Sequence, residues 1–346
     1  MNIGIKQVGN KNPAFIIAEA GVNHNNNLSL AFKMVDIAKK SGADAIKFQS
    51  WKTEKLLVKN AEKPKYQKSI KDKNYFELLK SLEPDQKDQK KIFDYCKKRN
   101  ILFLSTPYDE ESVDFLNDIG VLAFKISSSD LSNHILLEHI CKKKKPIILS
   151  TGLSTMKEID STIKFLAKKH MKNKTILLQA TSSYPTEDNE VNLKVISTYK
   201  KRYQMLVGLS DHTKNEIASL GAVAIGACII EKHFTTDRKQ YGPDQSSSLT
   251  PIELEIWIDK IKKLEKILGS SQKNITKSEK MNLSMRKVLM IKSKSKGEII
   301  KKQDIIARRV NGKGILPTNE NLNKILNKKL KKNIKEIRKM SWEFIQ

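Results

Sequence analysis

Short β-rich runs alternate with amphipathic stretches along most of the chain, and this alternation limits the possible fold more than any other feature. The stretches between the runs are helical in pattern. In residues 28–42, for example, an apolar stripe ends at Gly42. Eight strand–helix repeats over about 250 residues are what a closed parallel (β/α)8 barrel requires. The β-rich runs are 14–20, 43–49, 102–107, 121–127, 146–151, 175–181, 204–211 and 228–234.

A doubly wound open sheet is the alternative arrangement for the same alternation. That fold normally carries a glycine-rich phosphate-binding turn after its first strand. The segment at the end of the first run here, EAGVNHN (19–25), has no such turn. We therefore predict a TIM barrel over residues 1–268.

The sequence pattern changes after the barrel region. Residues 269–284 are polar and predict a linker with some helix, and residues 285–346 have a shorter period that predicts a small mixed domain. A domain of about 60 residues is close to the lower limit for independent folding. We expect it to lean on the barrel or on a partner chain.

The net charge of +27 raises the possibility of nucleic-acid binding, because basic surfaces attract phosphate backbones. However, only seven of the 65 basic residues are arginines, the side chain that suits paired recognition of phosphates and bases. A solvated lysine-rich surface is therefore favoured, and a basic RNA-binding protein is the alternative. We expect no nucleic-acid partner.

Neither the apolar runs nor the cysteines indicate a membrane or secreted protein. No apolar run approaches the roughly 20 residues of a membrane helix. The three cysteines have neither paired spacing nor metal-site spacing, which indicates a reduced, cytoplasmic environment.

Polar residues stand at the carboxyl ends of all eight runs. Barrels of this kind build their active sites at that end, so we expect a functional site there. The polar residues are Glu19, Lys47, Gln49, Ser105, Thr106, Lys125, Ser128, Ser150, Thr151, Ser182, Tyr184, Asp211, His212 and His233.

Two of these residues, Lys47 and Lys125, are expected inside the barrel, because their neighbours along the strand are apolar and suit the helix-facing side. A buried lysine is costly unless it meets an anion. An internal ion pair with Glu19 or Glu231 is one solution. The many hydroxyls nearby favour an anionic substrate, held in a cradle made of Lys47, Lys125, Ser128 and Ser150.

His212 and His233 end adjacent runs. Neutral imidazoles on neighbouring strands can bind one divalent metal and leave positions open for water and substrate. Glu231 precedes His233 by two residues, on the same strand face, and can orient an imidazole. A purely structural role for each histidine is the alternative.

A set of motifs in one order gives the chain a family resemblance. As a set they resemble the sialic acid synthase family, whose members condense phosphoenolpyruvate with an N-acylated mannose-type sugar. The tail, with KGEII (296–300) and ARRVNGKGILP (307–317), resembles that family's C-terminal antifreeze-like (SAF) domain. The barrel motifs are IIAEAGVNHN (16–25), IKFQ (46–49), FLSTPYD (103–109), FKISSSD (124–130), ILSTG (148–152), TSSYPT (181–186), GLSDHT (208–213), EKHFT (231–235) and GPD (242–244).

The resemblance implies a role for each matching residue. Glu19 is the acid–base carboxylate, and Asp244 lies near the sugar or a metal-bound water. His212 and His233 hold a divalent metal, Mn²⁺ or Mg²⁺. The residues that hold phosphoenolpyruvate are Lys47, Gln49, Thr106, Lys125, Ser128, Ser150, Ser182 and Tyr184.

The resemblance also implies a domain-swapped homodimer. In that family the small domain of one chain covers the barrel mouth of the other. Arg309 matches the arginine that reaches the N-acyl group of the sugar from the partner chain.

Some positions depart from the family pattern. Ser129 and Asp130 stand where many relatives have glycine and glutamate, and Gln245 replaces a histidine. Histidine and cysteine are common where this chain has Gln179 and Ala180. Because Asp130 shortens a sugar-contacting carboxylate, these departures leave the acceptor sugar open.

Several activities are therefore weighed. The first acceptor is N-acetylmannosamine, which gives N-acetylneuraminate, and the alternative is a 2,4-diacetamido-2,4,6-trideoxy sugar, which gives legionaminic acid. Pseudaminate synthesis is less favoured. A Schiff-base aldolase with Lys47 or Lys125 as the nucleophile is the alternative outside the family.

Overall fold

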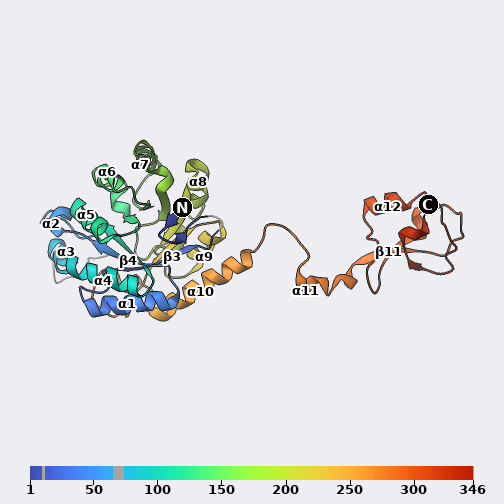
Figure 1. Ribbon diagram of the computed structural model, residues 1–346, viewed down its shortest axis with the longest axis horizontal. Helices are drawn as coiled ribbons and strands as arrows, with labels where there is room; N and C mark the ends of the chain where they lie inside the picture. The colour runs from blue at the N-terminus through green and yellow to red at the C-terminus, as the bar shows by residue number, and fades with distance from the viewer. Residues whose placement is uncertain (10–11, 65–73, 346) are drawn as a thin grey trace. The chain divides into compact units, whose positions relative to one another are not determined.

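The computed structural model describes residues 1–9, 12–64 and 74–345. The chain forms two compact units, Met1–Gly269 and Ser270–Gln346, and Figure 1 shows the elements of each. Each unit is described by itself below.

The first unit is built on an eight-stranded parallel sheet. The strand order is β5-β4-β3-β10-β9-β8-β7-β6, and the end strands β5 and β6 contact each other, so the sheet nearly closes into a barrel. The predicted TIM barrel is confirmed, and each predicted run coincides with one strand to within a few residues at either end. The strands are β3 (Phe15–Gly21), β4 (Ala45–Ser50), β5 (Leu102–Pro107), β6 (Phe124–Ile126), β7 (Ile147–Ser150), β8 (Thr175–Ala180), β9 (Leu206–Asp211) and β10 (Ile229–His233).

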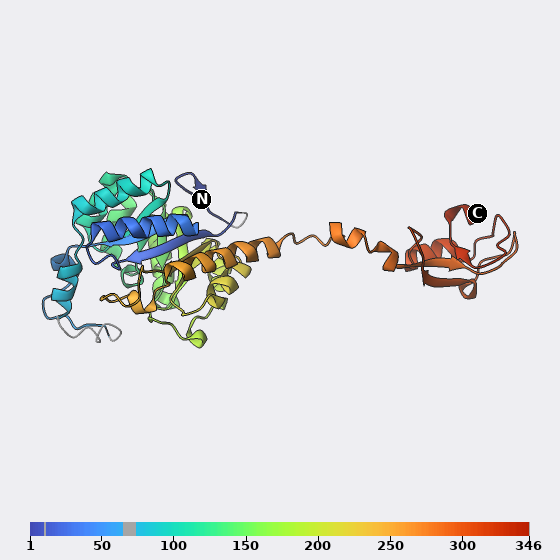
Figure 2. The same cartoon turned by 90° about the horizontal axis from the view of Figure 1, so that it is seen from below.

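Helices cover the outside of this sheet, and local signals define their ends. In α1 the side chain of Asn27 caps the first turn, and Gly42 ends the helix in the left-handed conformation at φ 86°. Figure 2 shows α1 beside α10, whose first turn carries a capping box formed by Thr250 and Glu253. The helices are α1 (Leu28–Ser41), α2 (Thr53–Leu56), α3 (Tyr75–Leu82), α4 (Gln86–Lys98), α5 (Glu110–Ile119), α6 (His134–Lys142), α7 (Met156–Lys168), α8 (Lys194–Tyr203), α9 (Ile217–Ala224) and α10 (Pro251–Leu268).

The amino-terminal half of the barrel interior is filled by apolar side chains. A short hairpin before the barrel, β1 (Asn2–Ile3) and β2 (Lys6–Gln7), adds Ile3 and Val8 to this layer. The sequence patterns above did not predict the hairpin. Ala123, directly before β6, belongs to the layer, and its strand residues are Phe15, Ile17, Ala45, Leu104, Ile148, Ile176, Leu178 and Ile229. Because this half is packed, the remaining interior space lies at the carboxyl ends of the strands.

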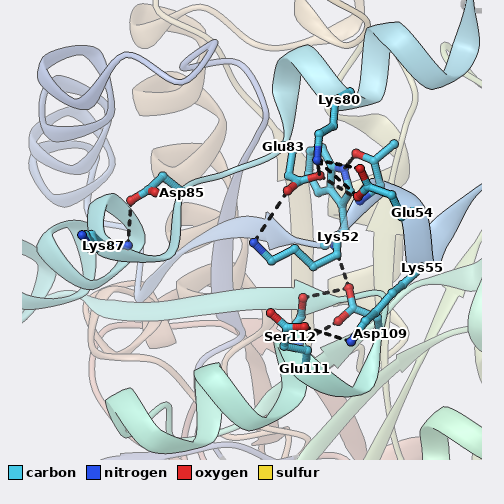
Figure 3. A network of polar contacts seen from close by, with 12 residues as sticks. Lys52, Glu54, Lys55, Lys80, Glu83, Asp85, Lys87, Asp109, Glu111 and Ser112 are labelled. Atoms are coloured by element: carbon cyan, nitrogen blue, oxygen red, sulfur yellow. Dashed lines mark hydrogen bonds and ion pairs between the residues drawn. The ribbon is translucent and has the colours of Figure 1, made fainter.

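Charged side chains link the parts of the segment that follows β4 (Figure 3). Lys80 on α3 pairs with Glu54 on α2 at 2.9 Å, and Lys52 pairs with Glu83 at 3.6 Å. Glu83 also accepts a hydrogen bond from the backbone N–H of Thr53 at 2.9 Å. These contacts hold α2 and α3 together.

The second unit contains a three-stranded antiparallel sheet in the order β12-β11-β13. Its core includes Leu289, Ile291, Ile300, Ile325 and Phe344. The strands are β11 (Lys287–Ile291), β12 (Ile305–Arg309) and β13 (Arg338–Lys339), and the helices are α11 (Lys277–Lys280) and α12 (Asn319–Ile325). The predicted linker 269–284 thus contains a short helix, α11.

Short 3₁₀ turns connect several of these elements. They are η2 (Ser128–Asp130), η3 (Lys172–Lys174), η4 (Asp188–Glu190), η5 (Gln245–Ser247), η6 (Leu283–Met285), η7 (Lys302–Asp304) and η8 (Trp342–Phe344). Among the described residues, every helix is too short or too polar to cross a membrane. The cysteines Cys96, Cys141 and Cys228 are buried and unpaired.

Candidate active site

The carboxyl-end half of the barrel interior is polar. Lys47 and Lys125 are 4% and 3% exposed, and each follows an interior alanine by two residues, Ala45 and Ala123 respectively. The residues next to them along the strands belong to the core between sheet and helices. Strand alternation therefore places both ammonium groups inside the barrel, as the sequence pattern predicts.

Lys47 lies between two carboxyl groups. Its Nζ is 2.8 Å from Glu19 Oε2 and 3.8 Å from Glu231 Oε2, and it donates a hydrogen bond to Thr106 Oγ1 at 3.0 Å. Burial raises the pKa of Glu19 to about 8, against the attraction of Lys47. Glu19 therefore holds a proton near neutral pH, which suits a general acid.

Lys125 contacts the other oxygen of the Glu231 carboxylate. Its Nζ donates to Ser150 Oγ at 2.6 Å and to the carbonyl of Ile126 at 3.1 Å, and it is 3.6 Å from Glu231 Oε1. Burial lowers the pKa of Lys125 to about 8. Burial acts to raise the pKa of Glu231, but Lys125 and Lys47 hold it at about 2.

These contacts combine two of the interpretations considered above. The internal ion pair with Glu231 is present, Glu19 also contacts Lys47, and hydroxyl groups surround the lysines. With Glu19 protonated, Glu231 is the ionised carboxylate between two ammonium groups, so positive charge remains for an anionic ligand.

Two further hydroxyls meet at Gly152, in the loop after β7. The Gly152 N–H donates to Ser128 Oγ at 3.0 Å. A Cβ at this position would lie 2.8 Å from Ser128 Oγ and 2.4 Å from Ser182 Oγ. Glycine thus leaves room for Ser128 and Ser182 to converge. Sequence reasoning did not single out Gly152 as a site residue, although it lies within the ILSTG motif.

At a second glycine, Gly21 at the end of β3, carboxyl groups that are distant in sequence approach one another. A Cβ there would lie 3.4 Å from Asp244 Oδ2, 3.5 Å from Glu19 Oε1 and 3.6 Å from Gln49 Nε2. Asp244 is 8% exposed, and burial raises its pKa to about 6. The predicted residues Glu19, Gln49 and Asp244 therefore border one space, although Asp244 is far from the others in sequence.

His212 and His233 lie side by side, with ring centroids 5.7 Å apart. The Tyr184 ring is 4.2 Å from the His212 ring and 5.7 Å from the His233 ring. His212 Nδ1 is 2.7 Å from the carbonyl of Thr181, so Nδ1 donates and Nε2 keeps its lone pair. Ser210, next to that lone pair, donates instead to Glu231 at 2.8 Å.

The two histidines fit the donor set of an open divalent-metal site. Burial lowers the pKa of both, so both rings are neutral. His233 Nδ1 is buried and has no hydrogen-bond partner among the described residues. Over residues 1–9, 12–64 and 74–345, no cluster of three or more histidine, cysteine or acidic residues forms a closed metal site. A metal held by two imidazoles keeps positions open for water and substrate.

Asp130 and Arg309 are two further predicted substrate-binding residues. The Asp130 carboxylate accepts hydrogen bonds from Ser127 at 2.7 Å, Ser129 at 3.3 Å and Asn133 at 3.0 Å. Arg309 is the exposed last residue of β12 in the second unit. Contacts of these two residues with a substrate stay predictions.

Three of the polar strand-end residues do not face the site. Ser105 bonds to Ser50 at 2.7 Å, Thr151 donates to the carbonyl of Leu178 at 2.9 Å, and Asp211 accepts a hydrogen bond from Ser219 on α9. Alternate residues of a strand face opposite sides of the sheet, so these three side chains lie outside the barrel interior.

The fold and the interior side chains define the class of this protein, a (β/α)8-barrel enzyme with its polar site at the carboxyl ends of the strands. A model of the NeuB family matches residues 34–273. The chain therefore belongs to the NeuB family, and the resemblance to sialic acid synthases is confirmed.

Relatives span nearly the whole chain. It is 43% identical to the N,N'-diacetyllegionaminic acid synthase of Campylobacter jejuni, over 91% of this chain and 96% of that protein. It is 35% identical to the N-acetylneuraminate-9-phosphate synthase of Homo sapiens, over 79% and 76%. A solved N-acetylneuraminic acid synthetase from Leptospira borgpetersenii, in complex with citrate, superposes with a TM-score of 0.74 at 37% identity, over 83% of this chain and 95% of that one.

Proposed function

We propose that this enzyme condenses phosphoenolpyruvate with an N-acylated mannose-type sugar and water, giving a nine-carbon sialic acid and phosphate. The observation that carries the proposal is the pair of ammonium groups, Lys47 and Lys125, buried at the carboxyl end of a barrel beside several hydroxyls. Such a pocket suits a small ligand with both a carboxylate and a phosphate.

The chemistry divides among the residues of the pocket. Carbon 3 of phosphoenolpyruvate bonds to the aldehyde carbon of the sugar, and water adds at carbon 2. The bond from carbon 2 to the bridging oxygen then breaks, phosphate leaves with that oxygen and the bonding electrons, and the hydroxyl on carbon 2 loses its proton to become the keto group. Lys47 and Lys125 stabilise the phosphate charge as it develops. Glu19, protonated near neutral pH, donates a proton to the aldehyde oxygen.

The other residues bind and orient the two substrates. Hydroxyls and polar groups around the lysines hold phosphoenolpyruvate, and Asp244 faces the sugar from across Gly21. His212 and His233 would hold Mn²⁺ or Mg²⁺, which supplies Lewis-acid polarisation of the aldehyde. The phosphoenolpyruvate contacts are Gln49, Thr106, Ser128, Ser150, Ser182 and Tyr184.

Two acceptor sugars are supported about equally. N-acetylmannosamine leads to N-acetylneuraminate, the class of product named for the relatives from Homo sapiens and Leptospira borgpetersenii. A 2,4-diacetamido-2,4,6-trideoxymannose leads to N,N'-diacetyllegionaminic acid, the product named for the relatives from Campylobacter jejuni and Legionella pneumophila. We propose that Asp130 and Asp244 decide between the two sugars.

The assembly belongs to the same proposal. The second unit is an antifreeze-like (SAF) domain that covers the barrel mouth of a partner chain in a homodimer, with Arg309 reaching the sugar. A cytoplasmic location and the lack of a nucleic-acid partner stay predictions.

The test is phosphate release from phosphoenolpyruvate with each sugar in turn, measured in chelator-treated protein with and without added Mn²⁺. We expect release with one of the two sugars and loss of activity without metal. His233→Ala should abolish the phosphate release that depends on Mn²⁺, whereas His139→Ala, a change on α6 outside the barrel, should not. No release with either sugar in folded protein contradicts the proposal.

The lowered pKa of Lys125 makes a Schiff-base aldolase the competing activity. Borohydride reduction in the presence of pyruvate separates the two chemistries. The proposed synthase leaves no adduct detectable by mass spectrometry, and an adduct on Lys125 or Lys47 supports the aldolase instead.

A further inference from the structure

We propose that a buried ion pair behind the two histidines, Lys232 with Asp211, sets the spacing of His212 and His233 for metal binding. This inference rests on the proposed metal site. Lys232 directly precedes His233 on β10, and Asp211, the last residue of β9, directly precedes His212. The two charged residues are also cross-strand partners in the parallel register of β9 and β10.

The pair faces away from the substrate. Strand alternation turns Lys232 and Asp211 toward α9, while the histidines turn inward. Lys232 is 3% exposed and Asp211 is 2% exposed, and their charged atoms are 2.9 Å apart. Neither side chain has a part in the reaction described above.

The Lys232 ammonium holds the loop that follows β9. Its Nζ donates to the carbonyl of Thr213 at 2.7 Å and to the carbonyl of Asn215 at 3.1 Å. A side chain of the strand that carries His233 therefore binds the loop that carries His212. This contact ties the backbones of the two histidines together.

The Asp211 carboxylate anchors the chain on both sides of His212. It accepts hydrogen bonds from the backbone N–H of Thr213 at 2.9 Å and from its hydroxyl at 2.8 Å, and a further one from Ser219 on α9 at 2.5 Å. Both residues that flank His212 are thus anchored. The ring itself is oriented separately, through Thr181.

A buried ion pair has a large desolvation cost in free energy. Two apolar side chains of similar volume are often as stable or more stable than a buried ion pair. Apolar side chains, however, cannot bind the carbonyls of Thr213 and Asn215. The contacts therefore point to positioning, because they join the strand that carries His233 to the loop that carries His212, and the separation of the two histidines determines where a metal can be held.

The experiment compares three proteins after chelator treatment: wild type, Lys232→Met and the matched control Lys200→Met. Lys200 on α8 makes the same kind of contact, to the carbonyls of Gly226 at 2.9 Å and Ile225 at 3.3 Å, before β10 begins. Mn²⁺ affinity is measured by calorimetry, and hydrogen–deuterium exchange is followed over residues 212–216 in the metal-free protein.

We expect Lys232→Met to weaken Mn²⁺ binding by about tenfold or more and to speed exchange over 212–216. The KM for phosphoenolpyruvate should stay close to the wild-type value. Lys200→Met should match the wild type in both measurements. If Lys232→Met does not fold, Lys232→Met/Asp211→Asn removes both charges and keeps an acceptor for Thr213, and the same loss of affinity is expected.

Each other result overturns the inference. Equal Mn²⁺ affinity in wild type and Lys232→Met overturns this inference without contradicting the proposed function. So does a loss that Lys200→Met shares, or one that disappears on cooling well below the melting temperature, because either indicates general destabilisation. A wild type that binds no Mn²⁺ contradicts the metal site of the proposed function, and the inference fails with it.

Discussion

Gly152 keeps open a space in which two serine hydroxyls meet. A methyl group at this position would collide with Ser182 Oγ and Ser128 Oγ, because the ideal Cβ lies 2.4 Å and 2.8 Å from them. We therefore expect Gly152→Ala to raise the KM for phosphoenolpyruvate by about tenfold, the equivalent of losing one to two hydrogen bonds, with little change in melting temperature. Steady-state kinetics with phosphoenolpyruvate as the varied substrate measures this.

Gly221→Ala is the matched control for that change. Gly221 lies within α9, where a Cβ meets the end of the Leu193 side chain at 2.7 Å, and alanine favours the helix. We expect unchanged kinetics. An unchanged KM in Gly152→Ala would show that the two serines do not hold phosphoenolpyruvate.

His24, next to the end of β3, links stability to pH. The imidazole is 6% exposed, and its Nδ1 accepts a hydrogen bond from the backbone N–H of Asn26 at 3.0 Å. Burial lowers its pKa from 6.5 to about 4. Below pH 6.5 this imidazole therefore binds a proton in the unfolded chain but not in the folded protein. The free energy of unfolding consequently falls as the pH falls toward 4.

We expect the wild type to lose about 2 kcal/mol of unfolding free energy between pH 7 and pH 5 through this residue. His24→Asn keeps an acceptor and cannot titrate. The advantage of the wild type over this variant, measured by urea unfolding, should thus be about 2 kcal/mol smaller at pH 5. An equal difference at both pH values would contradict the burial argument.

At the scale of elements, the segment that carries α2 and α3 depends on one carboxylate (Figure 3). Glu83 accepts from Thr53 N at 2.9 Å and from Lys80 at 3.1 Å, and its side chain is 13% exposed. Glu83→Ala leaves a buried N–H without its partner, which should cost about 1–3 kcal/mol. Hydrogen exchange over residues 53–56 should become faster.

Glu111→Ala is the comparison within the same network. Glu111 pairs with Lys55 at 2.9 Å, but both side chains are nearly half exposed. An exposed pair contributes about 0–1 kcal/mol, so exchange over 53–56 should stay close to the wild type. If the two variants behave alike, burial of the Glu83 contacts does not govern this segment.

Strand alternation explains which site residues were predictable at this scale. Lys47 and Lys125 were placed inside the barrel because the residues on either side of each are apolar, and this pattern is local. The same rule, applied to Ser105, Thr151 and Asp211, places them outside. Polarity at a strand end was therefore a weaker signal than polarity combined with the face of the strand.

At the scale of the whole molecule, the proposed dimer makes each active site depend on two chains. Arg309→Ala should raise the KM for the sugar and leave the KM for phosphoenolpyruvate unchanged. Arg308→Ala, a change at the neighbouring exposed position of β12, is the control and should leave both unchanged. Size-exclusion chromatography with light scattering should show a dimer for all three proteins.

Mixing two impaired variants, assayed at a sugar concentration far below the raised KM of Arg309→Ala, tests whether the arginine acts between chains. Lys125→Ala removes the barrel site and Arg309→Ala removes the proposed partner contact, so a mixed dimer keeps one complete site. After unfolding and refolding the two together, about a quarter of wild-type activity should return. No recovery would place Arg309 within its own chain's site or outside any site.

The sequence by itself determined the eight strands, the barrel they form, the interior position of the two lysines and the family. These features follow from the periodic spacing of apolar residues, from the order of the elements along the chain and from short motifs, all of which the sequence itself contains. The tertiary structure decided which of the polar groups meet. Asp244 joins Glu19 at Gly21, Glu231 lies between the lysines, and Lys232 reaches the loop of His212. Such contacts join residues that are distant in sequence, so they follow from closure of the barrel, which brings the strand ends together.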